Sequence, residues 1–302
     1  MLQPVSDVAA SVDAGSRNGS DPVVAEPPHS VPIFAAVPNY NMSGNLQKLL
    51  PTILAQGYTD VFVLDDASTD ATVDVVREFQ PEVKLLRSPR NRGAGANRNQ
   101  IIGQVPDAGI LHFIDADMDL VTTDTPTVAR ELFDRYGREG VGAIGGLVTT
   151  IEGDQEPHNY GAVFSLWGGF TSGLPLMVHR LRNRPRLAAA LQRAAAPILK
   201  GWPNVLADPV PAPAYWLHEG NMLISAAVFR ACGGYDPSIR SHEAQDLAIN
   251  LERRNIKRWF DPAIWTRHQH IDVRGDNRRK WENHAARYLI RKYGVYRWLT
   301  DR

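Results

Sequence analysis

Three carboxylates stand at alternate positions, Asp115, Asp117 and Asp119, directly after the apolar run 110–114. Like charges this close repel one another, and a bound cation removes that repulsion. Carboxylate oxygens are ligands that Mg²⁺ and Mn²⁺ prefer, and either ion keeps coordination positions for phosphate oxygens. The segment therefore predicts Mn²⁺ or Mg²⁺ bound beside a departing diphosphate. In the alternative interpretation, the aspartates only cap the segment that follows.

Two further polar clusters also follow apolar runs. Asp65 and Asp66 come directly after the run 61–64, where a carboxylate is able to accept hydrogen bonds from a ribose or a base. The segment 91–99 contains two glycines, which let backbone amides approach a phosphate at the start of a helix. Within it, Arg98 carries donors suited to a base or a diphosphate. Both clusters are therefore candidates for nucleotide binding.

A pair of histidines, His268 and His270, follows the apolar run 259–266. Alternate residues of a strand point to the same side, so the two imidazoles are expected to lie together. A neutral imidazole is able to complete the ligand shell of a metal, and we assign this role to His270. In the alternative interpretation, the pair is a surface feature without a ligand.

Alternating strand and helix patterns position these clusters. In the first half, strands are predicted at 31–37, 61–64, 83–86 and 110–114, and helices at 46–54, at 71–79 and from the turn 91–95 to about Gly103. In the second half, strands are predicted at 141–149, 221–225 and 259–266, and helices at 127–136, 226–232, 243–254 and 281–293. This order indicates an α/β fold with a mostly parallel central sheet, in which ligands bind at the carboxyl ends of the strands.

The composition excludes several classes of function. The chain has 302 residues, of which 43% are hydrophobic, so it is able to bury a large core. Lys and Arg total 33 and Asp and Glu total 33, so no net charge favours a nucleic-acid partner. A single cysteine, Cys232, excludes an intramolecular disulfide framework and fits a reducing compartment such as the cytoplasm.

Two adjacent stretches of the sequence indicate how the chain could associate with a membrane. Glycines dilute the uncharged stretch 159–178, so it does not predict a membrane-spanning helix. The stretch 180–200 that follows contains five Arg and one Lys and no acidic residue. An apolar segment beside a basic one suits peripheral association with the inner face of the cell membrane. The alternative is a solvated helix beside a substrate loop.

Several motifs occur together in a characteristic order. They are Val37-Pro38-Asn39-Tyr40-Asn41, Val63-Leu64-Asp65-Asp66-Ala67-Ser68-Thr69-Asp70, Asn91-Arg92-Gly93, Asp115-Ala116-Asp117, Gly220-Asn221-Met222-Leu223-Ile224 and Gly233-Gly234-Tyr235-Asp236, followed by an acidic helix. Together they resemble the ordered motifs of family 2 glycosyltransferases with the GT-A fold, over residues 31–295. The resemblance implies a Rossmann-like nucleotide-diphospho-sugar transferase fold with a C-terminal acceptor-side region.

The resemblance also implies roles for individual residues. Those implied to contact the nucleotide are Pro38, Asn39, Asp65, Asp66 and Arg98. Asp115 and Asp117 correspond to the Asp-x-Asp pair of the family, in which Asp117 is the expected direct metal ligand and Asp115 a ligand of metal and donor.

The acidic helix departs from the family pattern. Where the family commonly has its catalytic base, this chain has Ala244. Glu243 and Asp246 lie three residues apart and so share a helical face. We expect Glu243 to be the base, with Asp246 as its structural partner or substitute. In the alternative interpretation, both carboxylates bind acceptor hydroxyls or cap the helix, and a retaining mechanism needs no base.

The expected function is metal-dependent transfer of a sugar, with inversion, from a nucleoside-diphosphate sugar to a hydroxyl of a glycan, lipid or small-molecule acceptor. Cell-wall, lipid-linked or polysaccharide glycan synthesis in a bacterium is the expected setting. The expected regions are a disordered tail (1–30), a nucleotide-sugar-binding half (31–150), an insertion with the acceptor and catalytic half (151–272) and a basic C-terminal helix (273–302). The alternatives are a degenerate nucleotide-sugar-binding protein and a sugar-phosphate nucleotidyltransferase, although 39–44 lacks the basic residues of a nucleotidyltransferase loop.

Overall fold

The computed structural model of the chain describes residues 31–271 and 275–300. The tail predicted at 1–30 lies outside the described residues, so the prediction of disorder there remains an expectation. Residues 31–302 form one compact unit. Among the described residues, no helix has the length and apolar character needed to cross a bilayer.

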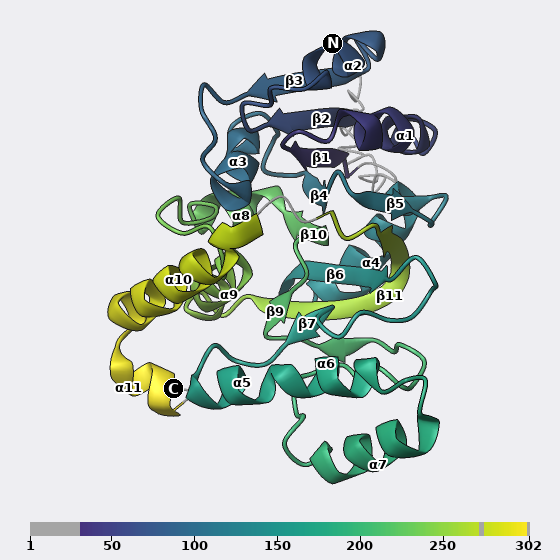
Figure 1. Cartoon of the computed structure of the whole chain (residues 1–302). Coiled ribbons are helices and arrows are strands. Elements are labelled where there is room, and N and C mark those ends of the chain that lie inside the picture. The colour runs from purple at the N-terminus through teal and green to yellow at the C-terminus, as the bar shows by residue number, and fades with distance from the viewer. Residues whose placement is uncertain (1–30, 272–274, 301–302) are drawn as a thin grey trace, which may run out of the picture. The chain divides into compact units, whose positions relative to one another are not determined.

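A nine-stranded mixed sheet forms the centre of this unit (Figure 1). Its strands are β1 (Ile33–Asn39), β2 (Asp60–Asp65), β3 (Val83–Arg87), β4 (Ile110–Ile114), β5 (Met118–Leu120), β6 (Val141–Thr149), β8 (Ala212–Pro213), β10 (Asn221–Ser225) and β11 (Lys257–His268). The order is β3-β2-β1-β4-β10-β6-β11-β5, with β8 also paired to β11. The first four strands in this order are parallel, as are β6 and β11, whereas β10, β5 and β8 run antiparallel to their neighbours. The predicted α/β fold is confirmed, with a mixed sheet.

Helices cover both faces of the sheet because side chains of a strand alternate between its two sides. In β1, Phe34 packs in one cluster with Phe229, whereas Ala35 packs in another with Leu50 and Ile53. The helices are α1 (Ser43–Leu54), α2 (Thr72–Glu78), α3 (Ala94–Arg98), α4 (Thr125–Gly137), α5 (Leu166–Thr171), α6 (Gly173–Arg180), α7 (Pro185–Ala195), α8 (Ala226–Ala231), α9 (Glu243–Glu252), α10 (Arg278–Tyr293) and α11 (Val295–Thr300).

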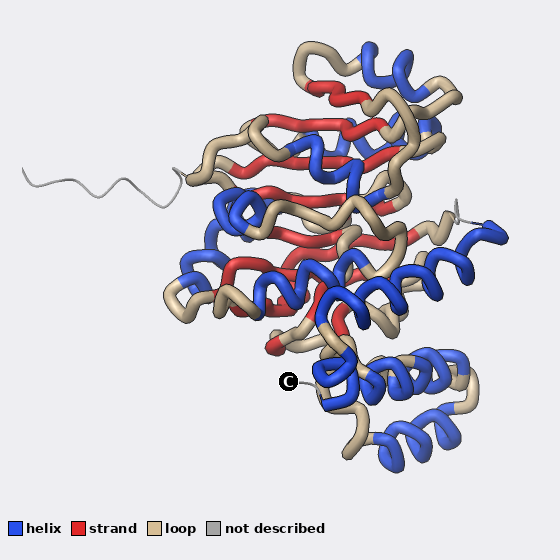
Figure 2. The backbone as a smooth tube through the Cα atoms, turned by 90° about the vertical axis from the view of Figure 1, so that its left-hand side faces the viewer, coloured by secondary structure: helices blue, strands red, loops and turns tan. Residues whose placement is uncertain are grey.

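The Arg-rich insertion is helical. Its helices α5, α6 and α7 gather at the lower end of the stacked strands (Figure 2). The insertion is joined to the rest of the fold by a two-stranded sheet of β7 (Tyr160–Gly161) and β9 (Trp216–Leu217). The strand predicted at 31–37 begins at Ile33 and continues to Asn39, because its parallel register with β2 extends to the pair Asn39 and Asp65.

Candidate active site

A cavity of about 890 Å³ lies beyond the carboxyl ends of β1, β2 and β4. The start of α9 and the end of β11 also line it. Eight of the ten predicted site residues line this cavity: Pro38, Asn39, Asp66, Arg98, Asp115, Asp117, Glu243 and His270. The structure therefore brings together residues from both halves of the chain at the sheet edge where ligands of α/β folds bind.

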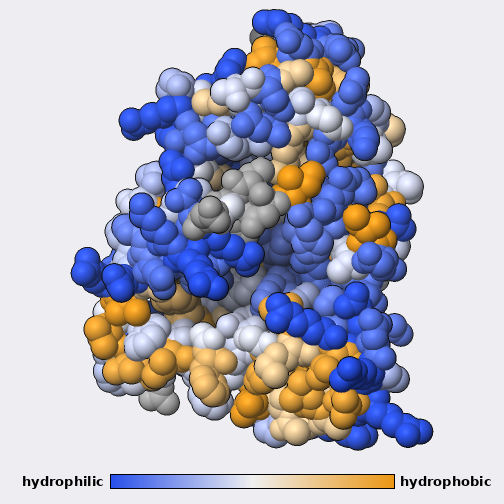
Figure 3. Space-filling view, in the orientation of Figure 1, coloured by the Kyte–Doolittle hydropathy of each residue, from blue (hydrophilic) through white to orange (hydrophobic). Residues whose placement is uncertain are grey.

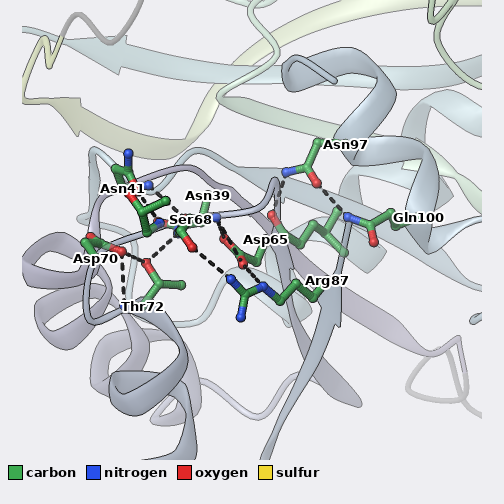
Figure 4. Close-up of polar contacts among 11 residues, drawn as sticks. Asn39, Asn41, Asp65, Ser68, Asp70, Thr72, Arg87, Asn97 and Gln100 are labelled. Carbon is green, nitrogen blue, oxygen red and sulfur yellow. Dashed lines mark hydrogen bonds and ion pairs between the residues drawn. The ribbon is translucent and has the colours of Figure 1, made fainter. Parts of the chain in front are cut away.

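Asp65 holds the loop after β2 in place through polar contacts (Figure 4), and it is not among the residues that line the cavity. Its fully buried carboxylate accepts a hydrogen bond from the amide of Ser68 at 3.1 Å and pairs with Arg87 Nε at 3.1 Å. From β1, Asn39 Nδ2 donates to Ser68 Oγ at 3.2 Å and to Thr72 Oγ1 at 3.0 Å. Asp65 is therefore positioned to support the loop around the cavity.

Asp66 lines the cavity and joins this loop to the glycine-rich turn. Its carboxylate accepts hydrogen bonds from the backbone amides of Arg92 and Gly93, each at 2.8 Å. Burial raises the pKa of Asp66, although these two amides and nearby arginines oppose the shift. Gly93 has φ +94°, in the left-handed region, and a Cβ there would lie 3.0 Å from Arg240 Cγ. The turn therefore requires glycine at this position.

Arg98 is a buried cation facing the cavity. Its side chain is 2% exposed, and Nη2 donates to Asp115 Oδ1 at 2.5 Å. Its Nη1 lies 3.8 Å from Glu219 Oε2. Within the described part of the chain, neither Nη1 nor Nε has a hydrogen-bond partner. Because unpaired buried donors are costly, these atoms suit an anionic ligand in the cavity.

Glu219 is a cavity residue that the sequence analysis missed. Burial raises the pKa of Glu219 to about 8; Glu243 and Asp115 add to the shift, and Arg98 opposes it. The sequence signal for it is its place directly before the motif that begins at Gly220. Its environment depends on Arg98, which approaches from a distant part of the chain.

A carboxylate and imidazole cluster lies at another wall of the cavity. His268 Nδ1 lies 2.8 Å from Glu156 Oε1, and His268 Nε2 lies 3.2 Å from Asp117 Oδ2. His270 Nε2 is 3.1 Å from the same Glu156 oxygen. One ligand atom from each of Glu156, His268 and His270 lies within 4.8 Å of the others. Glu156 follows β6 in an irregular segment, where no sequence pattern marks it as a site residue.

These side chains have the chemistry of a metal site. Burial alone would lower the pKa of His268, but hydrogen bonds to Asp117 and Glu156 raise this pKa to about 10. Burial opposes ionisation of both carboxyls, but His268 lowers the pKa of Asp117 and of Glu156. Oxygen ligands suit Mg²⁺ and Mn²⁺, and imidazole ligands favour a transition metal such as Mn²⁺. The predicted ligand Asp115 instead directs one oxygen to Arg98.

The two acidic residues of α9 have different surroundings. Glu243 lines the cavity, and a Cβ at Gly95 would lie 2.8 Å from Glu243 Cγ, so glycine allows α3 to approach α9. Asp246 is 1% exposed and accepts hydrogen bonds from Lys292 Nζ at 2.7 Å and Tyr293 Oη at 2.6 Å. Asp246 therefore anchors α10 to α9.

The first part of the chain is similar to a known protein family. Residues 35–173 match the sequence profile described as Glycosyl transferase family 2. The matched segment belongs to glycosyl transferase family 2. The match contains Asp66, Arg98, Asp117 and Glu156, and Glu243 lies beyond it.

Two curated proteins and one solved structure are similar to this chain. Glycosyltransferase AglE of Haloferax volcanii is 33% identical over 92 residues, which cover 28% of the chain and 30% of AglE. Succinoglycan biosynthesis protein ExoO of Rhizobium meliloti is 35% identical over 104 residues, which cover 33% of the chain and 28% of ExoO. Thus the similarity spans less than a third of each relative. The crystal structure of S. aureus TarS residues 1–349 in complex with UDP-GlcNAc has a TM-score of 0.53 at 15% identity, covering 82% of the chain and 61% of TarS, which shows a shared fold.

Proposed function

We propose that this chain is a metal-dependent glycosyltransferase that moves a sugar from a nucleoside diphosphate to an acceptor hydroxyl. The observation that carries the proposal is one cavity containing a glycine-rich turn, a buried guanidinium and a carboxylate–imidazole cluster. A diphosphate leaving group requires cationic and N–H donors, and an attacking hydroxyl requires a base. Each of these groups comes from a different element of the fold.

Donor binding involves the first half of the sheet edge. Pro38, Asn39 and Asp66 line the part of the cavity in which we place the nucleoside, with Asp65 supporting their loop. Arg98 donates to the diphosphate through Nη1 or Nε, while Asp115 keeps its guanidinium in position. Because the guanidinium is already fixed, little side-chain entropy is lost when the donor binds.

The metal ligands in this proposal are Asp117, Glu156, His268 and His270, with Asp115 remaining a candidate. When bound, Mn²⁺ or Mg²⁺ stabilises the negative charge on the departing diphosphate. Glu156 holds the two imidazoles on the same side as Asp117. The backbone supports this arrangement, because the amide of Gln269 donates to the carbonyl of Asp117 at 2.9 Å.

Proton transfer is assigned to Glu243. As the acceptor oxygen forms its bond to the anomeric carbon, the bond from that carbon to the diphosphate oxygen breaks, and its electron pair leaves with the diphosphate. Glu243 takes the proton of the attacking hydroxyl. A single displacement of this kind inverts the configuration at the anomeric carbon. Asp246 keeps α9 in place, so that Glu243 faces the cavity.

The similar proteins indicate which substrates to test first. UDP-GlcNAc, which is bound to TarS, is the first donor to test. The name of ExoO refers to succinoglycan biosynthesis, which supports a polysaccharide or lipid-linked glycan as the acceptor class. We propose that this chain acts in synthesis of such a glycan.

A donor screen tests the proposal. The full chain is incubated with UDP-, GDP- and dTDP-sugars, with glycan and lipid-linked acceptors, and with Mn²⁺ or EDTA, and the products are measured by mass spectrometry. We expect release of the nucleoside diphosphate and sugar transfer that requires the metal. Metal-dependent binding of a donor without turnover of any acceptor would support a nucleotide-sugar-binding protein instead. Formation of pyrophosphate from a nucleoside triphosphate and a sugar phosphate would indicate a nucleotidyltransferase.

A further inference from the structure

Large apolar side chains from two distant segments are exposed on neighbouring helices. Phe170 and Trp167 of α5 are 74% and 52% exposed, and Tyr296 of α11 is 71% exposed. The helices α5 and α11 are in contact. Figure 3 shows hydrophobic surface along the lower edge of the view, over the region of these helices. Aromatic rings this exposed have no role in the core of the described unit.

The exposed residues of α5 and α6 form a stripe. Leu166, Phe170, Gly173 and Met177 follow one another at intervals of three or four residues, so they lie on one side of the nearly continuous helix pair. The rings of Trp167 and Phe170 stack with their centroids 6.0 Å apart.

The opposite side of this pair packs internally. Val178 is fully buried, and Trp202 Nε1 donates to Thr171 Oγ1 at 3.0 Å. The helices are thus held by their inner side, and the stripe lies outside that packing.

The same insertion carries a strong local positive charge. Between Glu156 and Asp208 the sequence contains five Arg and one Lys and no acidic residue, although the whole chain has no net charge. Only Arg182 of these six pairs with a carboxylate among the residues that the structure describes, namely Asp154 at 2.6 Å. The other five are exposed: Arg180, Arg184, Arg186, Arg193 and Lys200.

We infer that the docking surface, defined as the stripe and Trp167 on α5 and α6 with Tyr296 and Leu299 of α11, binds an anionic lipid bilayer. Trp and Tyr favour the boundary between water and hydrocarbon, and Leu, Phe and Met bury apolar surface there. Basic residues near an anionic leaflet are attracted to its headgroups, and added salt weakens this attraction. The charge complementarity with anionic headgroups is what distinguishes a bilayer from an uncharged protein surface as the occupant.

The docking surface is connected to the cavity at both of its ends. β7, which precedes α5, pairs with β9, and Trp216 and Leu217 of β9 line the cavity. α10, which precedes α11, lines the cavity with Arg278 and Trp281. A bilayer bound at the surface would therefore present an acceptor close to the elements that form the site. This last step rests on the proposed function, whereas lipid binding does not.

Vesicle flotation tests the inference. The full chain is floated with vesicles of phosphatidylcholine alone and with vesicles that also contain an equal amount of phosphatidylglycerol. We expect binding to the anionic vesicles that weakens with added salt. The double variant Trp167→Ser/Phe170→Ser and the double variant Arg184→Glu/Arg186→Glu are each expected to weaken binding about tenfold or more.

Matched controls separate binding through this surface from nonspecific binding to vesicles. Val210→Ser removes an apolar side chain of similar exposure next to β8, and Arg138→Glu reverses an exposed charge after α4; neither is expected to change binding. Trp167→Phe keeps an aromatic ring at this position but removes the indole fluorophore. If brominated lipid quenches the fluorescence of the unmodified chain and this quenching is lost in Trp167→Phe, residue 167 inserts into the bilayer.

Three results would overturn the inference. They are an absence of binding to anionic vesicles, binding that both double variants retain, and lipid-independent self-association that Trp167→Ser/Phe170→Ser abolishes in sedimentation velocity. The last result would assign the surface to a second copy of the chain. Because lipid binding is measured without a sugar donor, failure of the docking surface is distinguishable from failure of the proposed transferase activity.

Discussion

His268 lies between two carboxylates, with Nε2 3.2 Å from Asp117 Oδ2 and Nδ1 2.8 Å from Glu156 Oε1. Asp117 belongs to the segment between β4 and β5, and Glu156 follows β6. The pairing of β11 with β5, in which His268 is opposite Met118, fixes this relationship. The imidazole therefore links Asp117, which lines the cavity, to Glu156, a carboxylate distant in sequence that is not among the lining residues.

This relationship predicts that Glu156 contributes to metal binding as well as Asp117. Asp117→Asn and Glu156→Gln are each expected to lower the affinity for Mn²⁺ by about 10- to 100-fold, because each removes an anionic oxygen beside the imidazoles. Titration followed by electron paramagnetic resonance measures the affinity. Asp119→Asn is the matched control, since Asp119 is exposed and bonded to Gln269. Equal affinity in Glu156→Gln and the unmodified chain would remove Glu156 from the ligand set.

Glu243 and Asp246 are expected to differ in what their replacement changes. Glu243→Gln should lower kcat by about 10²- to 10⁴-fold with little change in the donor KM, because it removes the base and leaves the donor contacts intact. Asp246→Asn should instead destabilise the fold by about 1 to 3 kcal/mol, because Lys292 and Tyr293 lose a charged acceptor. Steady-state kinetics and urea unfolding on both variants separate the two effects. The reverse pattern would exchange the two roles.

The sequence predicted the parts of the site that local pattern determines. Asp66 and Asp115 were identified because each follows an apolar strand, and chain order alone brings such strand ends to one edge of a parallel sheet. The central strands and most long helices were predicted for the same reason. Where a strand or helix packs on the core, its buried apolar residues recur every 2 or 3.6 residues, so the sequence pattern indicates the element.

What the sequence did not predict depends on contacts between distant segments. The three residues of β5 form a strand only because β11 pairs with them. Glu156 reaches His268 only after β6 and β11 have paired in parallel. Glu243 and Asp246 share a helical face by spacing, but α10 packs against Asp246 and separates their surroundings. Helix spacing carries no information about which neighbour covers a residue.

Glu219 predicts an unusual dependence of stability on pH. Its pKa in the folded protein, about 8, is above the ordinary value of 4.5, so the folded state holds this proton more tightly than the unfolded state. The resulting stabilisation is complete below about pH 4.5 and is lost as the pH rises through about 8. Glu219→Gln has nearly the shape of the uncharged Glu219 side chain but does not titrate. It should therefore reduce the decrease in Tm between these pH values. Calorimetry at both ends of the range measures it, with the exposed Glu139→Gln as control. Parallel Tm curves for Glu219→Gln and the unmodified chain would contradict the prediction.

Asp236 predicts loss of stability in acid. Although burial opposes ionisation, hydrogen bonds from Lys292, the amide of Ser238 and Tyr288 lower the pKa of Asp236 to about 2. The stabilisation is present above the ordinary value of 3.8 and is lost as the pH falls through about 2. Asp236→Asn should therefore cost about 1 to 2 kcal/mol near neutral pH and progressively less toward pH 2. Urea unfolding from neutral pH down to the lowest pH at which the chain stays folded measures the difference, and the exposed Asp134→Asn should show none. A constant difference across this range would mean that packing of α10, and not the charge of Asp236, accounts for the effect.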